Sequence, residues 1–101
     1  MKNLGKMMKQ AQEMQGKMAQ MQEEIKKSEH TGTSGGGLVN VTLNGKFEIR
    51  SLKIDPSIFN ADDAEMAEDL IVASFNDAKR KVDEFNKNEM SKLTGGIDLP
   101  E

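Results

Sequence analysis

The sequence predicts an α+β protein in which two long helices flank a small three-stranded antiparallel sheet. Apolar residues recur at helical spacing in residues 1–28 and again in residues 60–94, and residues 95–101 form a short tail. Within residues 29–55, apolar and polar residues alternate with the period of two that is typical of half-buried strands. The Asn44-Gly45 pair separates two alternating runs and favours a hairpin turn at that point.

The register of the hairpin follows from keeping its apolar residues on one face. A two-residue turn would place apolar residues opposite charged ones. A loop over residues 43–45, with its glycine at positive φ, instead pairs Val41 with Phe47 and Val39 with Ile49. We therefore expect this longer loop, and we expect these four side chains to share the buried face of the sheet.

The other residues of the predicted sheet indicate a bulge, a third strand and the end of the sheet. Leu52 and Ile54 fall out of phase with the preceding alternation, which predicts a bulge near Arg50-Ser51 or a strand end buried on both faces. A short edge strand around residues 29–33 would complete a sheet large enough to be stable. Asp55-Pro56 then ends the sheet, because proline has no N–H to donate to a neighbouring strand.

The first helix, from about Asn3 to Lys27, has an apolar stripe at heptad spacing. Lysine, glutamine and glutamate between the apolar positions favour helix, and the spacing is typical of a face that packs against another helix. We interpret its methionines as packing residues rather than as metal ligands. The stripe consists of Leu4, Met7, Ala11, Met14, Met18, Met21 and Ile25.

The second helix is expected to begin at a cap supplied by Asn60 or Asp62 and to end at Gly95, a natural left-handed cap. Its apolar stripe has steps of four and three residues, and the stripes of the two helices form the expected dimer or helix seam. That seam comprises Met7, Met14, Met18, Met21 and Ile25 from the first helix, with Ile71, Phe75, Val82 and Phe85 from the second.

Length and composition favour a single domain that assembles with a second copy. The 101 residues are 36% hydrophobic and 4% aromatic, which gives one chain only a thin core. Helices of this size are about 38 and 45 Å long, whereas a compact domain of this length is roughly 30 to 35 Å across. Both helices should therefore project from the sheet, and a two-fold dimer with helical arms would cover their apolar stripes.

Composition also limits the location and the chemistry. The chain has no cysteine, which excludes disulfides and thiolate metal sites. Its longest apolar run is residues 70–73, so we expect no membrane span and a cytoplasmic protein. The net charge of −3 is unevenly distributed, because residues 55–77 hold seven acidic residues and no basic one. The neighbouring segments carry an excess of positive charge.

Few residues are suited to catalysis. His30 is the single histidine and lies in a polar segment. The glycines of residues 35–37 precede a strand rather than the lysine and helix that a phosphate-binding loop requires. The acidic residues Asp62, Asp63, Glu65, Glu68 and Asp69 suit the start of a helix better than a metal cluster. We therefore predict no enzyme, no cofactor and no small-molecule substrate.

Six segments of the chain form a recognisable series: MMKQAQ (7–12), TGTSGGGLV (31–39), NGKFEI (44–49), IDPS (54–57), EDLIVASFNDA (68–78) and LTGGIDLP (93–100). In this order and at this spacing they closely resemble the YbaB/EbfC family of bacterial nucleoid-associated proteins over nearly the whole chain. The resemblance implies a single domain over residues 1–101 with α-β-β-β-α order, and a homodimer with splayed helices. It also implies binding of duplex DNA at the nucleoid, with roles in gene expression.

If the protein binds DNA, its lysines and arginines are the expected phosphate contacts. The sequence has no arginine-rich helix for reading bases and no aromatic platform for single strands, so we expect weak sequence preference. The alternative is a dimeric, coiled-coil-like scaffold that binds a partner helix through the Met seam. The candidate DNA-binding residues are Lys2, Lys6, Lys9, Lys17, Lys79, Arg80, Lys81 and Lys87.

Overall fold

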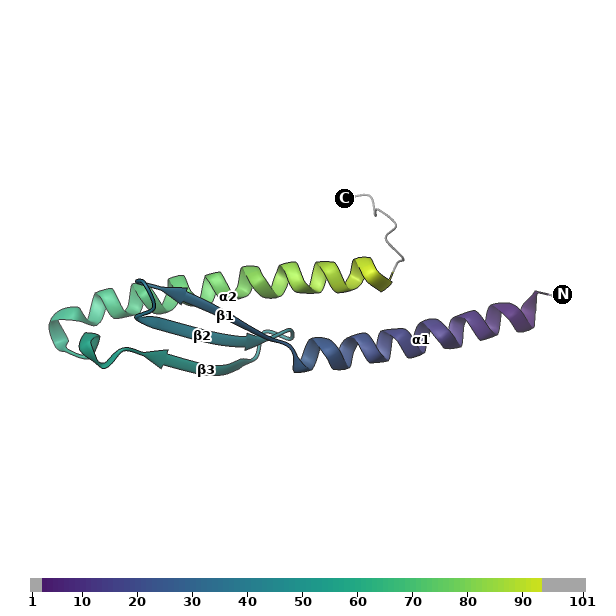
Figure 1. The fold of residues 1–101 in the computed structure, drawn as a ribbon, viewed down its shortest axis with the longest axis horizontal. Coiled ribbons are helices and arrows are strands. Elements are labelled where there is room, and N and C mark those ends of the chain that lie inside the picture. Colours follow the sequence, from purple (N-terminus) through teal and green to yellow (C-terminus); the bar gives the residue numbers. More distant parts are fainter. Residues whose placement is uncertain (1–2, 94–101) are drawn as a thin grey trace.

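A computed structural model describes residues 3–93 and confirms the predicted α+β class (Figure 1). The strands form one antiparallel sheet in the order β1-β2-β3. The elements are α1 (Leu4–Lys27), β1 (Glu29–Ser34), β2 (Val39–Asn44), β3 (Ile49–Ile54), two short 3₁₀ turns η1 (Pro56–Ile58) and η2 (Ala61–Asp63), and α2 (Ala64–Leu93).

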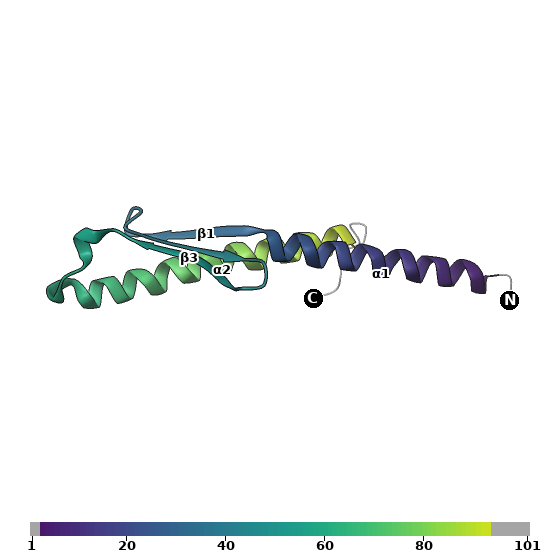
Figure 2. The ribbon, with the colours of Figure 1, turned by 90° about the horizontal axis from the view of Figure 1, so that it is seen from below.

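The molecule is strongly elongated. Its principal extents are 73 × 25 × 16 Å and its radius of gyration is 19.8 Å, against about 13 Å for a compact domain of similar length. The extension arises because α1 continues away from the end of the sheet, and Figure 2 shows sheet and α2 as two layers with α1 beyond them. The expected projection of the helices is thus seen most clearly for α1.

The core lies between α2 and the strands β1 and β2. Val39, Val41 and Leu43 of β2 are almost fully buried, as are Ala78 and Val82 of α2. The alternation in β2 therefore does bury one face, as its period of two predicts. Partly buried side chains of α2, including Ile71 and Phe75, extend this contact along the sheet.

Close packing of α2 on β1 depends on a glycine. A Cβ atom built on Gly32 would collide with the backbone of Ser74 and Ala78. Only glycine can occupy this position while α2 stays at its present distance, since a backbone cannot move aside as a flexible side chain can. The edge strand expected around residues 29–33 is confirmed, and Gly32 lies in it.

The predicted register of the hairpin is wrong. Val41 pairs with Leu52 and Val39 with Ile54, not with Phe47 and Ile49. Residues 45–48 form a longer loop than predicted, and within it Phe47 rather than the glycine adopts the left-handed conformation, with φ of 64°.

The Asn44 side chain explains this loop. Its Oδ1 accepts hydrogen bonds from the backbone N–H groups of Lys46 (2.9 Å) and Glu48 (3.0 Å), and its Nδ2 donates to the Glu48 carboxylate at 2.7 Å. Because one fully buried side chain satisfies two backbone donors, it fixes a turn that the period of two does not reveal.

The bulge predicted near Arg50-Ser51 is confirmed. Thr42 pairs with Ser51 and Leu43 with Ile49, so Arg50 is the additional residue on β3. The expectation that Phe47 and Ile49 are buried is wrong, since they are 40% and 60% exposed. The physical reason is that α2 packs mainly over β1 and β2 and leaves β3 largely uncovered.

The second helix begins as one of the two proposed caps predicts. Asn60 accepts a hydrogen bond from the Asp63 N–H at 3.0 Å and precedes η2, which leads directly into α2. Asp55-Pro56 follows the last residue of β3, as expected. The proposed stop at Gly95, the tail of residues 95–101 and Lys2 lie outside the described residues.

Candidate nucleic-acid interface

Both helices extend from the same end of the sheet. The N-terminal part of α1 and the C-terminal part of α2 lie on that side in both views (Figures 1 and 2), and their chains run in opposite directions. The 24 residues of α1 give a length of about 36 Å. Its last turn is fixed to the sheet, so most of its surface is free to contact another molecule.

The three lysines that precede the last turn of α1 lie on one face. Successive helical residues are about 100° apart, so Lys6, Lys9 and Lys17 fall within an arc of about 80°. All three are exposed and form no ion pair with any residue from 3 to 93. Glu13 and Glu24 are the carboxylates of α1 within the same arc. We call Lys6, Lys9 and Lys17 the lysine face of α1.

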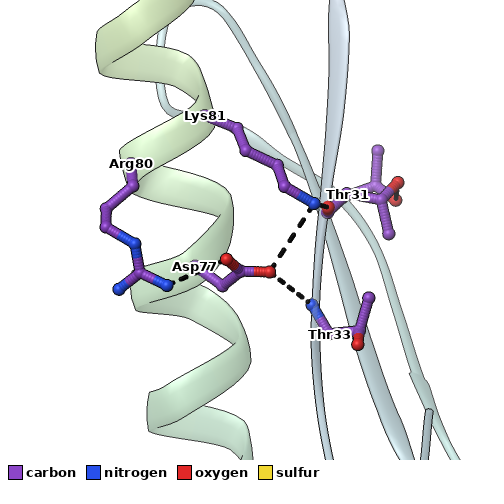
Figure 3. A network of polar contacts seen from close by, with 6 residues as sticks. Thr31, Thr33, Asp77, Arg80 and Lys81 are labelled. Carbon is purple, nitrogen blue, oxygen red and sulfur yellow. Dashed lines mark hydrogen bonds and ion pairs between the residues drawn. The ribbon is translucent and has the colours of Figure 1, made fainter. Parts of the chain in front are cut away.

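Two of the candidate cations on α2 are engaged by a carboxylate instead. Asp77 Oδ1 lies 2.9 Å from the Arg80 guanidinium, and Asp77 Oδ2 lies 3.6 Å from the Lys81 ammonium (Figure 3). The backbone N–H of Thr33 donates to Asp77 at 3.0 Å, while Lys81 donates to the Thr31 carbonyl at 2.7 Å. Asp77 and Lys81 thus bind the outer edge of β1.

The pKa of Asp77 agrees with its contacts to Thr33, Arg80 and Lys81. The hydrogen bond from the Thr33 N–H, followed by the charges of Lys81 and Arg80, holds the pKa of Asp77 below its usual value of 3.8. The carboxylate is therefore ionised at neutral pH and offsets positive charge beside β1. Both ion pairs of Asp77 could have been predicted from the sequence, because residues three and four positions apart share one face of a helix.

The structure does not bring all the candidate cations together within one chain. Lys79, Arg80 and Lys81 belong to the part of α2 that packs beside the sheet, and Lys79 is exposed there. Lys87 is exposed near the end of α2. Lys6 lies 19 positions before Ile25, which is about 28 Å along α1 from its junction with the sheet.

The proposed apolar seam forms two separate surfaces. Val82 is fully buried against the sheet, and Ile71, Phe75 and Phe85 are partly buried on the same side of α2. On α1, Met21 and Ile25 are 6% and 9% exposed, but the stripe before them is open to solvent. Its exposed fractions are 58% for Leu4, 62% for Met7, 44% for Met14 and 45% for Met18.

An open groove of about 240 Å³ separates α1 from the end of α2. Glu89 lies in it, only 8% exposed, and accepts a hydrogen bond from Lys92 at 3.3 Å. Lys17 contributes to the opposite wall. The burial of Glu89 could not be predicted from the sequence, because a glutamate on a charged helix gives no sign of it.

His30 has a structural position in the edge strand that was expected around residues 29–33. It lies in β1 with its ring centroid 4.8 Å from that of Phe85, and its Nε2 is 3.0 Å from Ser28 Oγ. Burial lowers the pKa of His30 below 6.5. Within residues 3–93, no three histidine or acidic side chains lie close enough to hold a metal ion. Neither helix in that range has the length and apolarity needed to span a membrane.

Comparisons with known proteins agree with this architecture. A model of the YbaB/EbfC DNA-binding family matches residues 1–97. Nucleoid-associated proteins of Rhodospirillum rubrum and Paramagnetospirillum magneticum are each 56% identical over 100 residues, covering 99% of this chain and 94% of theirs. A crystal structure of an uncharacterized Helicobacter pylori protein is similar, with a TM-score of 0.79 and 30% identity. That similarity covers 90% of this chain and 96% of the other.

Proposed function

The chain belongs to the YbaB/EbfC DNA-binding family, and from this we propose that it is a nucleoid-associated homodimer that grips duplex DNA with weak sequence preference. The lysine face of α1, with Lys2, Lys79 and Lys87, contacts phosphates. Binding alters DNA conformation and gene expression at the nucleoid. We assign it no catalytic activity.

The observation that carries the proposal is the lysine face of α1. Lys6, Lys9 and Lys17 share one side of a projecting helix and have no ion pair with a described residue, so their charges are available to phosphates. The acidic residues from Asp62 to Asp69 lie at the start of α2, at the opposite end of the molecule (Figure 1). This separation favours an approach of DNA to α1 despite the net charge of −3.

Dimerisation is supported by apolar surface that one chain leaves uncovered. Met7 and Met14 of α1 are exposed, and so are Ile49 and Leu52 of β3, which are 60% and 48% exposed. Apolar surface of this extent is typical of an interface between subunits. A two-fold partner would bury it and would present two lysine faces to one duplex.

Affinity for duplex DNA measured over a series of salt concentrations tests the proposal. Each phosphate contact releases a counterion, so the six lysines of the two lysine faces in a dimer contribute about −5 to the slope of log K against log salt. Lys9→Gln removes two of these contacts and should make the slope shallower by about 2.

Lys53→Gln is the matched control, because Lys53 is exposed on β3, away from α1. It should leave the slope close to that of the wild type. Absence of binding by the wild type at low salt, or equal losses from Lys9→Gln and Lys53→Gln, would contradict the proposal.

A second candidate function is a dimeric scaffold that binds a partner helix through the uncovered Met stripe of α1. The exposure of Met14 and Met18 favours it, since an apolar groove or stripe is what an amphipathic helix recognises. In that case Met14→Gln should abolish capture of the partner, and Lys9→Gln should leave it unchanged.

A further inference from the structure

One residue, Gly45, connects three elements of the fold through its backbone N–H and C=O groups. The Gly45 N–H donates to the Ile25 carbonyl in the last turn of α1 at 3.0 Å. The Gly45 carbonyl accepts a hydrogen bond from Asn86 Nδ2 of α2, also at 3.0 Å. The loop between β2 and β3 thus lies between the two helices and is bonded to both. We call Ile25, Gly45 and Asn86 the joint.

The packing at the joint is close. Gly45 is buried, and a Cβ atom on it would collide with the Ile25 carbonyl and side chain and would lie 2.9 Å from Ser28 Oγ. The Ile25 carbonyl also accepts from Ser28 Oγ at 2.7 Å. Since a helix end leaves its last carbonyls without intrahelical partners, these donors determine how α1 ends. A second polar link, from Arg50 to the Lys26 carbonyl, is longer at 3.5 Å.

If only the stability of the folded state mattered, Asn86 would be an unfavourable residue at this position. Its Oδ1 is buried and has no hydrogen-bond partner among the described residues, while its Nδ2 is bonded to Gly45. A buried acceptor without a partner destabilises the folded state, and an apolar side chain would avoid that cost. What the Asn86 amide contributes, and an apolar side chain could not, is its hydrogen bond to Gly45. This bond holds the Gly45 loop against α2, and the end of α1 is held with it.

We propose that Asn86 and Gly45 are positioning residues for DNA binding, which set the direction in which α1 leaves the sheet. This inference rests on the proposed function. A small change of angle at the joint displaces the far end of α1 by a large distance, because Lys6 lies about 28 Å along α1 from Ile25. A tilt of about 10° at the joint moves Lys6 by about 5 Å, more than the 3.4 Å rise between phosphates of one strand.

The test compares Asn86→Ala with Asn88→Ala, which removes the same side chain from an exposed position on the same helix. Asn86→Ala should weaken duplex binding about five- to tenfold, as expected when linked contacts lose their preorganisation. The amide of Gly45 should exchange with solvent faster, while the amide of Val41 in the core keeps its protection. Asn88→Ala should match the wild type in all three.

A direct measurement of α1 accompanies the binding data. The chain has no cysteine, so a spin label on Gln10→Cys reports one distance between the α1 helices of a dimer. That distance distribution should be narrow in the wild type and broader with Asn86→Ala. If Asn86→Ala fails to fold, Asn86→Leu keeps the branching at Cγ without the amide and should give the same results.

Two outcomes would overturn the inference. One is wild-type affinity for DNA in the Asn86 variants, and the other is an unchanged Gly45 exchange rate together with an unchanged distance distribution. Failure of the wild type to bind DNA would overturn the proposed function instead, and the label and exchange data would still decide whether the joint directs α1.

Discussion

At the scale of single residues, the Asp77 side chain contacts both strand β1 and its own helix α2. It accepts from the Thr33 N–H at 3.0 Å and pairs with Arg80 at 2.9 Å, while Lys81 donates to the Thr31 carbonyl. These contacts occupy backbone groups on the open edge of β1, which would otherwise be available to another strand. Lys81 therefore binds the sheet edge directly and Arg80 pairs with the carboxylate that does so, and the sequence did not distinguish the two from cations available to DNA.

Asp77→Asn should reduce stability at neutral pH but not in strong acid. The pKa of Asp77 is lower in the folded state than 3.8, so its contribution is fully present above about pH 3.8 and is lost as pH falls through the lower folded value. Urea unfolding at pH 7 and at pH 2 measures the difference between variant and wild type. A difference of equal size at both pH values would contradict the assigned role.

Gly32→Ala should destabilise the fold, because the added methyl collides with the backbone of Ser74 and Ala78. Overpacking of this kind costs about 1–3 kcal/mol or more. Gly16→Ala is the control, since nothing lies within 4 Å of that position in α1, and it should stabilise the helix by up to about 1 kcal/mol. Thermal unfolding measures both, and a neutral Gly32→Ala would show that α2 is not held at this distance.

At the scale of elements, periodicity predicted the helices and strands but not how they contact one another. The period of two placed Val39 and Val41 on the buried face correctly, and the phase change predicted the bulge at Arg50. It failed at the loop, where Asn44 binds the N–H groups of two later residues. Hydrogen bonds from one side chain leave no periodic trace in a sequence.

The same limit applies to the candidate interface. The heptad stripe of α1 was visible in the sequence, but the spacing does not say which helix covers it. In the structure α2 reaches only the stretch that includes Met21 and Ile25, while Met14 remains exposed. The positions of Asn86 and Glu89 of α2 were not predicted, because their burial depends on the loop and the helix that lie opposite them.

Replacing Met14 and Met18 together by glutamine tests whether a second copy covers the stripe of α1. Both side chains are nearly half exposed in one chain, at 44% and 45%, so the sheet core should remain folded. Because each is already more than half buried, covering it in a dimer would contribute roughly 1 kcal/mol of apolar transfer free energy, and the double variant should dissociate at higher concentration. Mass in solution over a dilution series measures this, with Gln15→Ala as the control on exposed α1 surface. An unchanged dimer would place the interface elsewhere.

At the scale of the whole molecule, shape and charge act together. The protein is 73 Å long, with lysines of α1 towards one end and the acidic start of α2 at the other (Figure 1). A polyanion is attracted to the first end and repelled by the second, and the net charge of −3 does not reveal this. The orientation of DNA on the protein is therefore the property that the fold determines most directly.

Mapping backbone amide resonances during titration with duplex DNA tests this orientation most directly. Binding of DNA at the lysine face should give salt-sensitive shifts of the amides from Gly5 to Met18 on α1, and little change from Asp62 to Asp69. The Asn86→Ala variant should reduce the α1 shifts at equal DNA concentration. Shifts concentrated at the start of α2 or along β3, with α1 unaffected, would contradict the claim that the lysine face of α1 contacts DNA.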